Sequence, residues 1–231
     1  MGGLAHARRP RLQPERVRLL QHRLIRWYRR HGRDLPWRRT RDPYRILVSE
    51  VMLQQTQVER VVDYYHRFLR RYPTFETLAA APEPEVREAW QGLGYYARAR
   101  NLQRTAQAVA EQYGGALPAQ RRAMQRLPGI GPYTAGAVLS FAFGQDAAIL
   151  DTNAARVLQR FFRVRVRGPK AGLQRRLWQV AEAVTPSGQA YEFNQAIMDL
   201  GATVCRARQP ECPRCPLRGG CRSAPRRRPQ K

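Results

Sequence analysis

Apolar residues recur at intervals of three and four along much of the chain, the spacing that places them on one face of a helix. The clearest runs are 17–27, 58–69, 102–110 and 178–184. Turn signals separate the helical segments, at His31-Gly32, Tyr72-Pro73, Gly114-Gly115 and Gly129-Ile130-Gly131. No alternating apolar and polar stretch flanks a hairpin turn, as a strand pair would require. The pattern therefore predicts an all-α protein, and its many helical segments favour two connected subdomains.

The length of 231 residues and an apolar content of 43% are enough for a core of its own. No apolar run approaches the roughly 20 residues of a membrane-spanning helix, and no apolar segment follows the basic N-terminus, as a signal peptide would need. We therefore expect a soluble, cytoplasmic protein that associates with the nucleoid rather than with a membrane. Residues 1 to about 15 and 222–231 are rich in Arg and Pro, so we expect neither end to pack.

Positive charge dominates the composition, since 42 Lys and Arg face 17 Asp and Glu, for a formal net charge of +25. Such a surplus repels itself in a compact fold and indicates a polyanionic partner, of which nucleic acid is the leading candidate. The alternative is a solvated basic surface or basic tails such as 226–228. Nearly all of the charge is Arg, because Lys occurs only at Lys170 and Lys231.

All four cysteines lie near the C-terminus in the spacing C-x6-C-x2-C-x5-C, at Cys205, Cys212, Cys215 and Cys221. Thiolates are soft ligands for zinc or iron-sulfur clusters, and disulfides are rare in a reducing cytoplasm, so a metal site is indicated. Structural zinc usually takes its ligands from two short pairs, whereas here one C-x2-C pair has longer gaps on both sides. The spacing therefore favours a [4Fe-4S] cluster, with zinc as the alternative.

Residues 127–139, LPGIGPYTAGAVL, have the composition of a tight turn that opens a helix. Gly129 and Gly131 would permit positive φ and close backbone approach, and Pro132 suits the first helical turn. Exposed amides at such a helix start bind a DNA phosphate without reading sequence. The alternative is an ordinary glycine turn between core helices. The net charge and the helical stretch 120–126 before it favour a helix-hairpin-helix.

Five segments in this order resemble the adenine DNA glycosylases (the MutY group) and their relatives, endonuclease III and the archaeal-type mismatch thymine glycosylases. The resemblance covers about residues 24–221. The segments are PWRRTRDPY at 36–44, SEVMLQQTQVERV at 49–61, GLGYYARARNL at 92–102, LPGIGPYTAGAVLSFAFGQ at 127–145, and the cysteine array.

The resemblance implies an all-α, two-domain helix-hairpin-helix DNA glycosylase fold with a C-terminal [4Fe-4S] cluster loop. Residues 35–145 would form a six-helix barrel domain that contains the helix-hairpin-helix at about 117–140. Residues 146–221 would form the cluster domain, joined by the N-terminal tail and helix of 1–34, and 222–231 would be a disordered basic tail. Double-stranded DNA would lie in the cleft between the domains of a monomer.

The resemblance also implies two catalytic acids, Asp151 after the hairpin helix and Glu50 in the SEVMLQQT segment. Cleavage of an N-glycosidic bond builds an oxocarbenium-like sugar while electrons move onto the departing base, so it requires an anion and an acid. Glu50 would protonate adenine at N7, and Asp151 would stabilise the sugar cation. Burial between Val48 and Val51 would favour the acid form of Glu50. The alternatives are that Asp151 caps the helix at 154–160 and that Glu50 is a surface acid.

Relatives with lyase activity place a nucleophilic Lys where this chain has Tyr133. No other Lys lies nearby, so a Schiff-base pathway lacks its amine. We therefore expect a monofunctional glycosylase that leaves an abasic site. The resemblance assigns Gln55 and Tyr95 to filling the gap left by the extruded base, and Arg38, Tyr133 and Asn153 to the pocket. The alternative for Tyr95 is a core aromatic beside a glycine turn.

Two departures bear on the choice of base. The chain has Thr152 where the MutY group usually has Gly, and it stops ten residues after Cys221, without the usual C-terminal domain that recognises 8-oxoguanine. The leading hypothesis is excision of adenine opposite guanine or 8-oxoguanine; the alternative is excision of thymine or uracil opposite guanine. A non-catalytic DNA-binding iron-sulfur protein and a zinc-dependent transcription factor are more remote. The joint presence of Glu50 and Asp151 counts against a non-catalytic protein. The lack of a base-reading module counts against a transcription factor.

Overall fold

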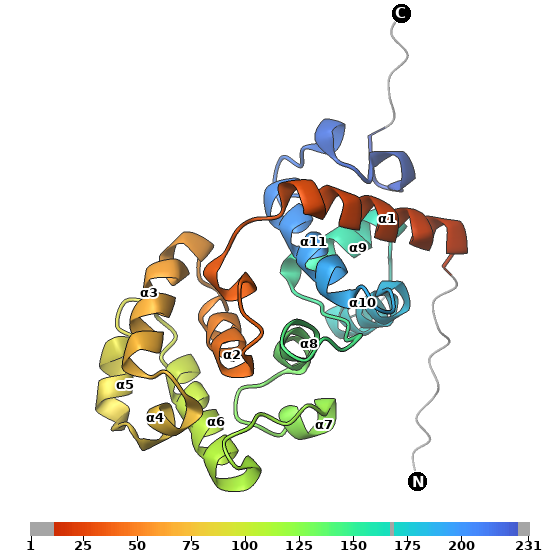
Figure 1. The fold of residues 1–231 in the computed structure, drawn as a ribbon. Helices are drawn as coiled ribbons and strands as arrows, with labels where there is room; N and C mark the ends of the chain where they lie inside the picture. The colour runs from red at the N-terminus through yellow and green to blue at the C-terminus, as the bar shows by residue number, and fades with distance from the viewer. Residues whose placement is uncertain (1–11, 167–168, 226–231) are drawn as a thin grey trace, which may run out of the picture. The chain divides into compact units, whose positions relative to one another are not determined.

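A computed structural model describes residues 12–166 and 169–225, and in these residues every regular element is a helix. The predicted all-α class is therefore confirmed (Figure 1). The chain divides into two compact units, one of Asp34–Gln145 and one that combines Met1–Arg33 with Asp146–Lys231. None of the helices in the described part of the chain is long and apolar enough to cross a membrane.

The unit Asp34–Gln145 contains two short helices in which most residues are buried, α2 (Pro43–Met52) and α8 (Pro132–Phe141). Helix α2 packs against α8 and also against α3 and α6. The remaining elements of the unit are η1 (Pro36–Arg38), α3 (Val58–Arg71), α4 (Phe75–Ala80), α5 (Glu83–Ala89), α6 (Ala97–Tyr113) and α7 (Arg121–Met124). A helix that is covered all round carries polar groups only where they find partners, so its polar residues mark positions of interest.

The sequence sets the start of α2 clearly. Asp42 caps the helix, because its carboxylate accepts hydrogen bonds from the backbone N–H groups of Tyr44 at 2.8 Å and Arg45 at 3.1 Å. Pro43 occupies the first helical position, where no intrahelical N–H bond is lost. The cap and the apolar run that follows it fix the register of the helix that carries Glu50.

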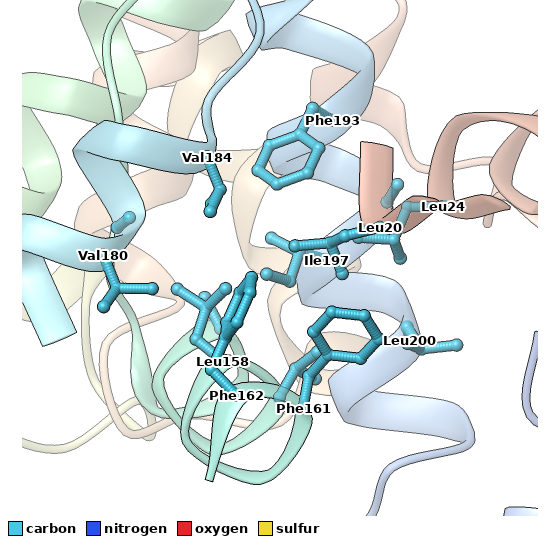
Figure 2. Packing of buried hydrophobic residues seen from close by; sticks show 14 of the residues in the cluster. Leu20, Leu24, Leu158, Phe161, Phe162, Val180, Val184, Phe193, Ile197 and Leu200 are labelled. Carbon is cyan, nitrogen blue, oxygen red and sulfur yellow. The ribbon is translucent and has the colours of Figure 1, made fainter. Parts of the chain in front are cut away.

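The other unit contains α1 (Pro14–His31), α9 (Thr152–Phe162), α10 (Lys170–Val184) and α11 (Ala190–Thr203), followed by η2 (Cys212–Arg214) and η3 (Arg218–Gly220). Helix α11 packs against both α1 and α9. Figure 2 shows Leu20 and Leu24 of α1 among apolar side chains of the later helices, such as Ile197 and Phe193. Burial of these side chains joins the N-terminal helix to the C-terminal part of the chain.

The four apolar runs all fall within helices, namely α1, α3, α6 and α10. Three of the turn signals lie at the ends of α1, α3 and α6, and the fourth precedes α8. Three expectations need correction. The stretch 120–126 contains a shorter helix than expected, α7. The N-terminal end packs earlier than expected, since Leu12 contacts the core and α1 begins at Pro14. The C-terminal end packs further than expected, since the backbone N–H of Arg222 donates to the carbonyl of Phe161 at 3.0 Å. The expectations for residues 1–11 and 226–231 lie outside the described residues.

Candidate active site

Glu50 is a buried acid in the last turn of α2. Only 4% of its surface is exposed, so the interpretation as a surface acid is wrong. The hydroxyl of Tyr133, in the first turn of α8, donates a hydrogen bond to Glu50 Oε2 at 2.7 Å. Burying a carboxyl group is unfavourable unless hydrogen bonds compensate it, and such a group is oriented by the partner that it keeps. The packing of α2 on α8 therefore brings two of the predicted site residues together.

Asp151 is the N-cap of α9 in the other unit. Its Oδ1 accepts the backbone N–H of Ala154 at 2.7 Å, and its Oδ2 accepts the side-chain amide of Asn153 at 2.9 Å. The alternative that Asp151 caps this helix is confirmed, and capping leaves the carboxylate half-buried with both oxygens hydrogen-bonded. Thr152 is the first residue of helix α9. Any residue can adopt the helical backbone conformation, so this position does not require glycine.

A chain of hydrogen bonds continues from Asn153 towards the cysteines. Arg156 donates to Asn153 Oδ1 at 2.6 Å, to the carbonyl of Gly201 at 2.7 Å and to the carbonyl of Cys205 at 2.8 Å. Arg156 was not predicted from the sequence, because one Arg among many carries no spacing signal. Its contacts link the residue beside Asp151 to the first cysteine of the array.

Gln55 and Tyr95 share an unusual backbone conformation. Both lie in exposed turns of the unit Asp34–Gln145 with positive φ, 56° for Gln55 and 48° for Tyr95. Tyr95 is 60% exposed, so its interpretation as a core aromatic is wrong. Non-glycine residues with positive φ are strained and cluster at functional sites.

Arg98, at the start of α6, is the residue that connects these two turns, and sequence reasoning missed it. Its guanidinium donates to the carbonyl of Gln54 at 2.6 Å and to the carbonyl of Gly94 at 3.1 Å. The GLGYYARARNL segment contains Arg98, but the sequence does not distinguish it from the neighbouring arginines. Arg98 differs from the neighbouring arginines by its burial, and burial becomes known only from the folded structure.

Arg38 ends η1, and η1 packs against α2, the helix that carries Glu50.

The predicted site residues fall into two groups, one in each compact unit. Arg38, Glu50, Gln55, Tyr95, Tyr133 and the hairpin glycines belong to the unit Asp34–Gln145. Asp151, Asn153 and the cysteines belong to the other unit.

The hairpin before α8 requires glycine at one position only. Gly129 has φ of 74°, and a Cβ there would lie 2.8 Å from the Cβ of Asn101. Gly131 has φ of −83° and ψ of 178°, so the expectation of positive φ at this position is wrong. Gly131 is instead the extended N-cap of α8, without a side-chain cap, and a Cβ there would meet nothing within 4 Å. The first turn of α8 thus keeps backbone N–H groups that no cap side chain satisfies.

The four cysteines are half-buried and form no disulfide. Cys205, Cys215 and Cys221 pack against the apolar core of their unit, and Arg160 donates to the Cys205 sulfur at 3.4 Å. Burial raises the pKa of the Cys215 thiol to about 11. Within 12–166 and 169–225, no three His, Cys, Asp or Glu side chains are arranged to hold a metal ion. The donor set itself, four thiols on one short segment with an arginine beside them, fits a thiolate-ligated centre.

Comparisons with known proteins show which family the chain resembles. The family of HhH-GPD superfamily base excision DNA repair proteins matches residues 48–183. The adenine DNA glycosylase of Buchnera aphidicola is 41% identical over 201 residues, 87% of this chain and 57% of that protein. The thymine-DNA glycosylase of Aeropyrum pernix is 40% identical over 214 residues, 91% of this chain and 96% of that protein.

Among solved structures, a thermostable thymine-DNA glycosylase matches with a TM-score of 0.84 and 34% identity, covering 91% of this chain and 97% of that chain. This chain spans only 57% and 38% of the length of two adenine DNA glycosylases that it matches. The family match covers more than half of the chain, and the match to the Aeropyrum pernix relative covers 91% of this chain and 96% of that protein. The chain therefore belongs to the HhH-GPD superfamily of base excision DNA repair proteins.

Proposed function

We propose that this chain is a monofunctional DNA glycosylase that hydrolyses the N-glycosidic bond of adenine mispaired with guanine or 8-oxoguanine. The observation that carries the proposal is the pair of Glu50 and Tyr133, a buried carboxyl group oriented by a phenol at 2.7 Å. A buried and oriented carboxyl group is typical of a general acid. The names of the relatives, all DNA glycosylases, support the reaction class.

In the proposed reaction Glu50 donates a proton to N7 of adenine, so that the base departs neutral. Asp151 balances the positive charge that develops on the sugar, and its fixed oxygens need little reorganisation to do so. A water molecule then adds to the sugar carbon and releases the proton that restores the acid form of Glu50. The products are free adenine and an abasic site.

The side chain of Tyr133 supports hydrolysis without strand cleavage. A lyase reaction through a Schiff base requires an amine, and Tyr133 instead presents a hydroxyl that is engaged with Glu50. A glycosylase of this kind leaves the DNA backbone intact until alkali or a second enzyme cleaves it.

Thymine or uracil opposite guanine is the second candidate substrate, for one reason. The chain spans 96% of the length of the thymine-DNA glycosylase of Aeropyrum pernix at 40% identity. A pyrimidine has no N7, so Glu50 would then need a different acceptor, which is why we rank this substrate second.

DNA binding is proposed for the hairpin and the basic surface. The N–H groups at the start of α8 that lack a side-chain cap suit a phosphate oxygen, and Thr105 holds the hairpin by donating to the carbonyl of Pro128 at 2.8 Å. The net charge of +25 supplies attraction that does not depend on sequence.

Cys205, Cys212, Cys215 and Cys221 would hold a [4Fe-4S] cluster in the proposed protein. Such a cluster would cross-link and stabilise the segment 205–221, which has only two short 3-10 helices of its own. It would take no part in the hydrolysis. Arg160 supports this assignment, because its hydrogen bond to the Cys205 sulfur favours the thiolate that a cluster requires.

The substrate assignment is tested with labelled duplexes that contain A opposite 8-oxoguanine, A opposite G, T opposite G or U opposite G. Abasic sites are cleaved with hot alkali after incubation. We expect product from the two adenine duplexes, with none when alkali is omitted. Glu50→Gln and Asp151→Asn should abolish product, whereas Glu59→Gln and Asp63→Asn, at exposed positions on α3, should not. Product from only the thymine or uracil duplexes would select the second substrate, and inactivity on all four would refute the glycosylase proposal.

The cluster assignment is tested separately on anaerobically purified protein by iron and sulfide analysis and by visible absorption. We expect about four iron and four sulfide per chain for a [4Fe-4S] centre. Replacement of Cys212 by Ser should lower the iron content, because that residue supplies one of the four proposed ligands. Stoichiometric zinc without sulfide would select the zinc alternative.

A further inference from the structure

Arg98 is a buried cation that no acid neutralises. Only 8% of its surface is exposed, and among the described residues it makes no ion pair with Asp or Glu. Burial lowers its pKa. Because an uncompensated buried charge is costly, a guanidinium in this setting must be held by several neutral acceptors.

The first group of acceptors lies where α2 ends. One terminal nitrogen of Arg98 donates to the carbonyl oxygens of Val51 at 2.9 Å, Met52 at 2.7 Å and Gln54 at 2.6 Å. The other donates to the hydroxyl of Thr56 at 3.1 Å. The carbonyls of Val51 and Met52 belong to the last turn of α2, where unpaired carbonyl groups carry partial negative charge.

The second group of acceptors lies in the turn that precedes α6. The same guanidinium donates to the carbonyl oxygens of Leu93 and Gly94, both at 3.1 Å. The guanidinium carbon lies 5.5 Å from the centre of the Trp90 ring, and the Trp90 side-chain N–H donates to the carbonyl of Gly94 at 3.2 Å. A single side chain therefore cross-links two turns that are about 40 residues apart in sequence.

Each of the two turns carries one exposed, non-glycine residue with positive φ, Gln55 in the first and Tyr95 in the second. The acceptors of Arg98 stand directly beside them, since Gln54 and Thr56 flank Gln55 and Gly94 precedes Tyr95. The guanidinium carbon also lies 5.6 Å from the ring centre of Tyr95. Strained conformations persist only where the surroundings fix them, and here Arg98 bonds to the residues beside both.

We propose that Arg98 is a positioning residue for base extrusion, which holds Gln55 and Tyr95 as one preformed pair that fills the duplex when the target base leaves the stack. This inference rests on the proposed function of the site. Because the same guanidinium binds the end of α2, it also fixes the helix turn that carries Glu50 relative to this pair. Arg98 touches neither substrate nor reacting atoms in this role.

The test compares Arg98→Lys with the wild type and with Arg104→Lys, a matched control at an exposed position on the same helix. Lysine keeps the charge but lacks the planar fork that reaches two turns at once. Extrusion is read from the fluorescence of 2-aminopurine placed opposite guanine in a duplex, which rises when that base leaves the stack and requires no bond cleavage. Excision of adenine and affinity for an undamaged duplex are measured on the same samples.

We expect Arg98→Lys to lose most of the fluorescence rise and to slow single-turnover excision by about 10-fold or more, as misplacement of positioning groups does. Affinity for the undamaged duplex should change less than about 2-fold, since phosphate contacts set it. An undiminished fluorescence rise in folded Arg98→Lys would overturn the inference. A wild type that extrudes the base but excises none would refute the proposed glycosylase function and leave the role of Arg98 in extrusion standing.

Hydrogen exchange separates positioning from general stabilisation. In Arg98→Lys the backbone amides of 53–57 and 91–96 should exchange faster together, while those of α3 and α8 keep their wild-type rates. Faster exchange throughout the unit Asp34–Gln145 would mean that Arg98 only stabilises the fold, which contradicts the inference.

Discussion

The hydroxyl of Tyr133 reaches Glu50 across 83 residues of sequence, because α8 and α2 pack against each other inside one unit. The two side chains come from helix ends, the first turn of α8 and the last turn of α2. Each is held by a buried helix rather than by a loop. If Glu50 is the proposed proton donor, this placement orients it before the substrate binds.

Replacement of Tyr133 by Phe should therefore slow excision without weakening DNA binding. The change removes the hydroxyl that donates to a nearly fully buried carboxyl group, and a buried acceptor left without its donor costs about 1–3 kcal/mol, or roughly 5- to 150-fold in rate. Single-turnover excision measures the loss, and anisotropy with an uncleaved duplex measures binding. Tyr113→Phe, at the end of α6, is the control, and an equal loss in that variant would contradict a specific role for Tyr133.

The two hairpin glycines should respond differently to alanine. Gly129→Ala meets both a positive φ of 74° and a contact of 2.8 Å with Asn101, so it should lower the free energy of unfolding by about 1–3 kcal/mol. Gly131→Ala meets neither obstacle and should leave the melting temperature unchanged.

The same pair tests phosphate binding by the hairpin. If a DNA phosphate approaches the backbone N–H groups at the start of α8, a methyl group on Gly131 should weaken binding although the fold is intact. Thermal denaturation and duplex titration of both variants measure the two effects. Unchanged affinity in Gly131→Ala would place the phosphate contact elsewhere.

Sequence periodicity predicted the helices that have one apolar face. Helices α1, α3, α6 and α10 each bury one side and expose the other, so their apolar residues recur every three or four positions. Helices α2 and α8 are buried almost all round, and their importance was inferred from the resemblance to known glycosylases instead. The cysteine spacing pointed to a metal site by itself, because ligand spacing is a local property.

The residues that were missed, or interpreted in two ways, depend on contacts that are distant in sequence. Glu50 lies between apolar and polar neighbours, so the local pattern allowed both burial and exposure. Arg98 and Arg156 resemble many other arginines of this chain until the fold surrounds them with carbonyl groups. At Gly131 the sequence pattern was clear but the inference from it was wrong, since a glycine in a turn signal does not by itself fix the sign of φ.

Replacement of Gly201 by Ala should disturb the group around Asp151. A Cβ at Gly201 would lie 2.6 Å from the Cβ of Asn153 and 3.0 Å from its backbone, so α11 and the start of α9 would have to separate. We expect a loss of about 1–3 kcal/mol in stability, as for other overpacked sites. Excision should fall as well, because Asn153 holds Asp151 through a hydrogen bond of 2.9 Å.

Gly172→Ala in α10 is the matched control. Its Cβ would make an ordinary contact of 3.4 Å with Val166, and alanine favours a helix over glycine by about 1 kcal/mol. Denaturant unfolding and single-turnover excision measure both variants. If Gly201→Ala retained wild-type activity, Asn153 would not position Asp151 as proposed.

Stability should decline in alkali because two tyrosines of the unit Asp34–Gln145 are buried in neutral form. Burial raises the pKa of Tyr65 to about 12 and raises that of Tyr44 further, whereas a tyrosine in the unfolded chain titrates near 10. A group whose pKa is raised by folding contributes its full stability below the unfolded pKa. That contribution is lost as the pH rises through the folded pKa, so unfolding should become easier from about pH 10 upward.

Replacement of Tyr44 by Phe tests this pH dependence of stability at neutral and at alkaline pH. At neutral pH the variant loses the hydrogen bond from its hydroxyl to the carbonyl of Tyr72, 2.7 Å long, so it should be about 1 kcal/mol less stable than the wild type. Above pH 10 its stability should fall less steeply, because one buried hydroxyl no longer ionises on unfolding.

Tyr96→Phe, at an exposed position, is the control and should change neither the stability at neutral pH nor its slope above pH 10. Denaturant unfolding of the three proteins between pH 7 and pH 11 measures the slopes, and identical slopes for Tyr44→Phe and the wild type would contradict the role of the buried phenol.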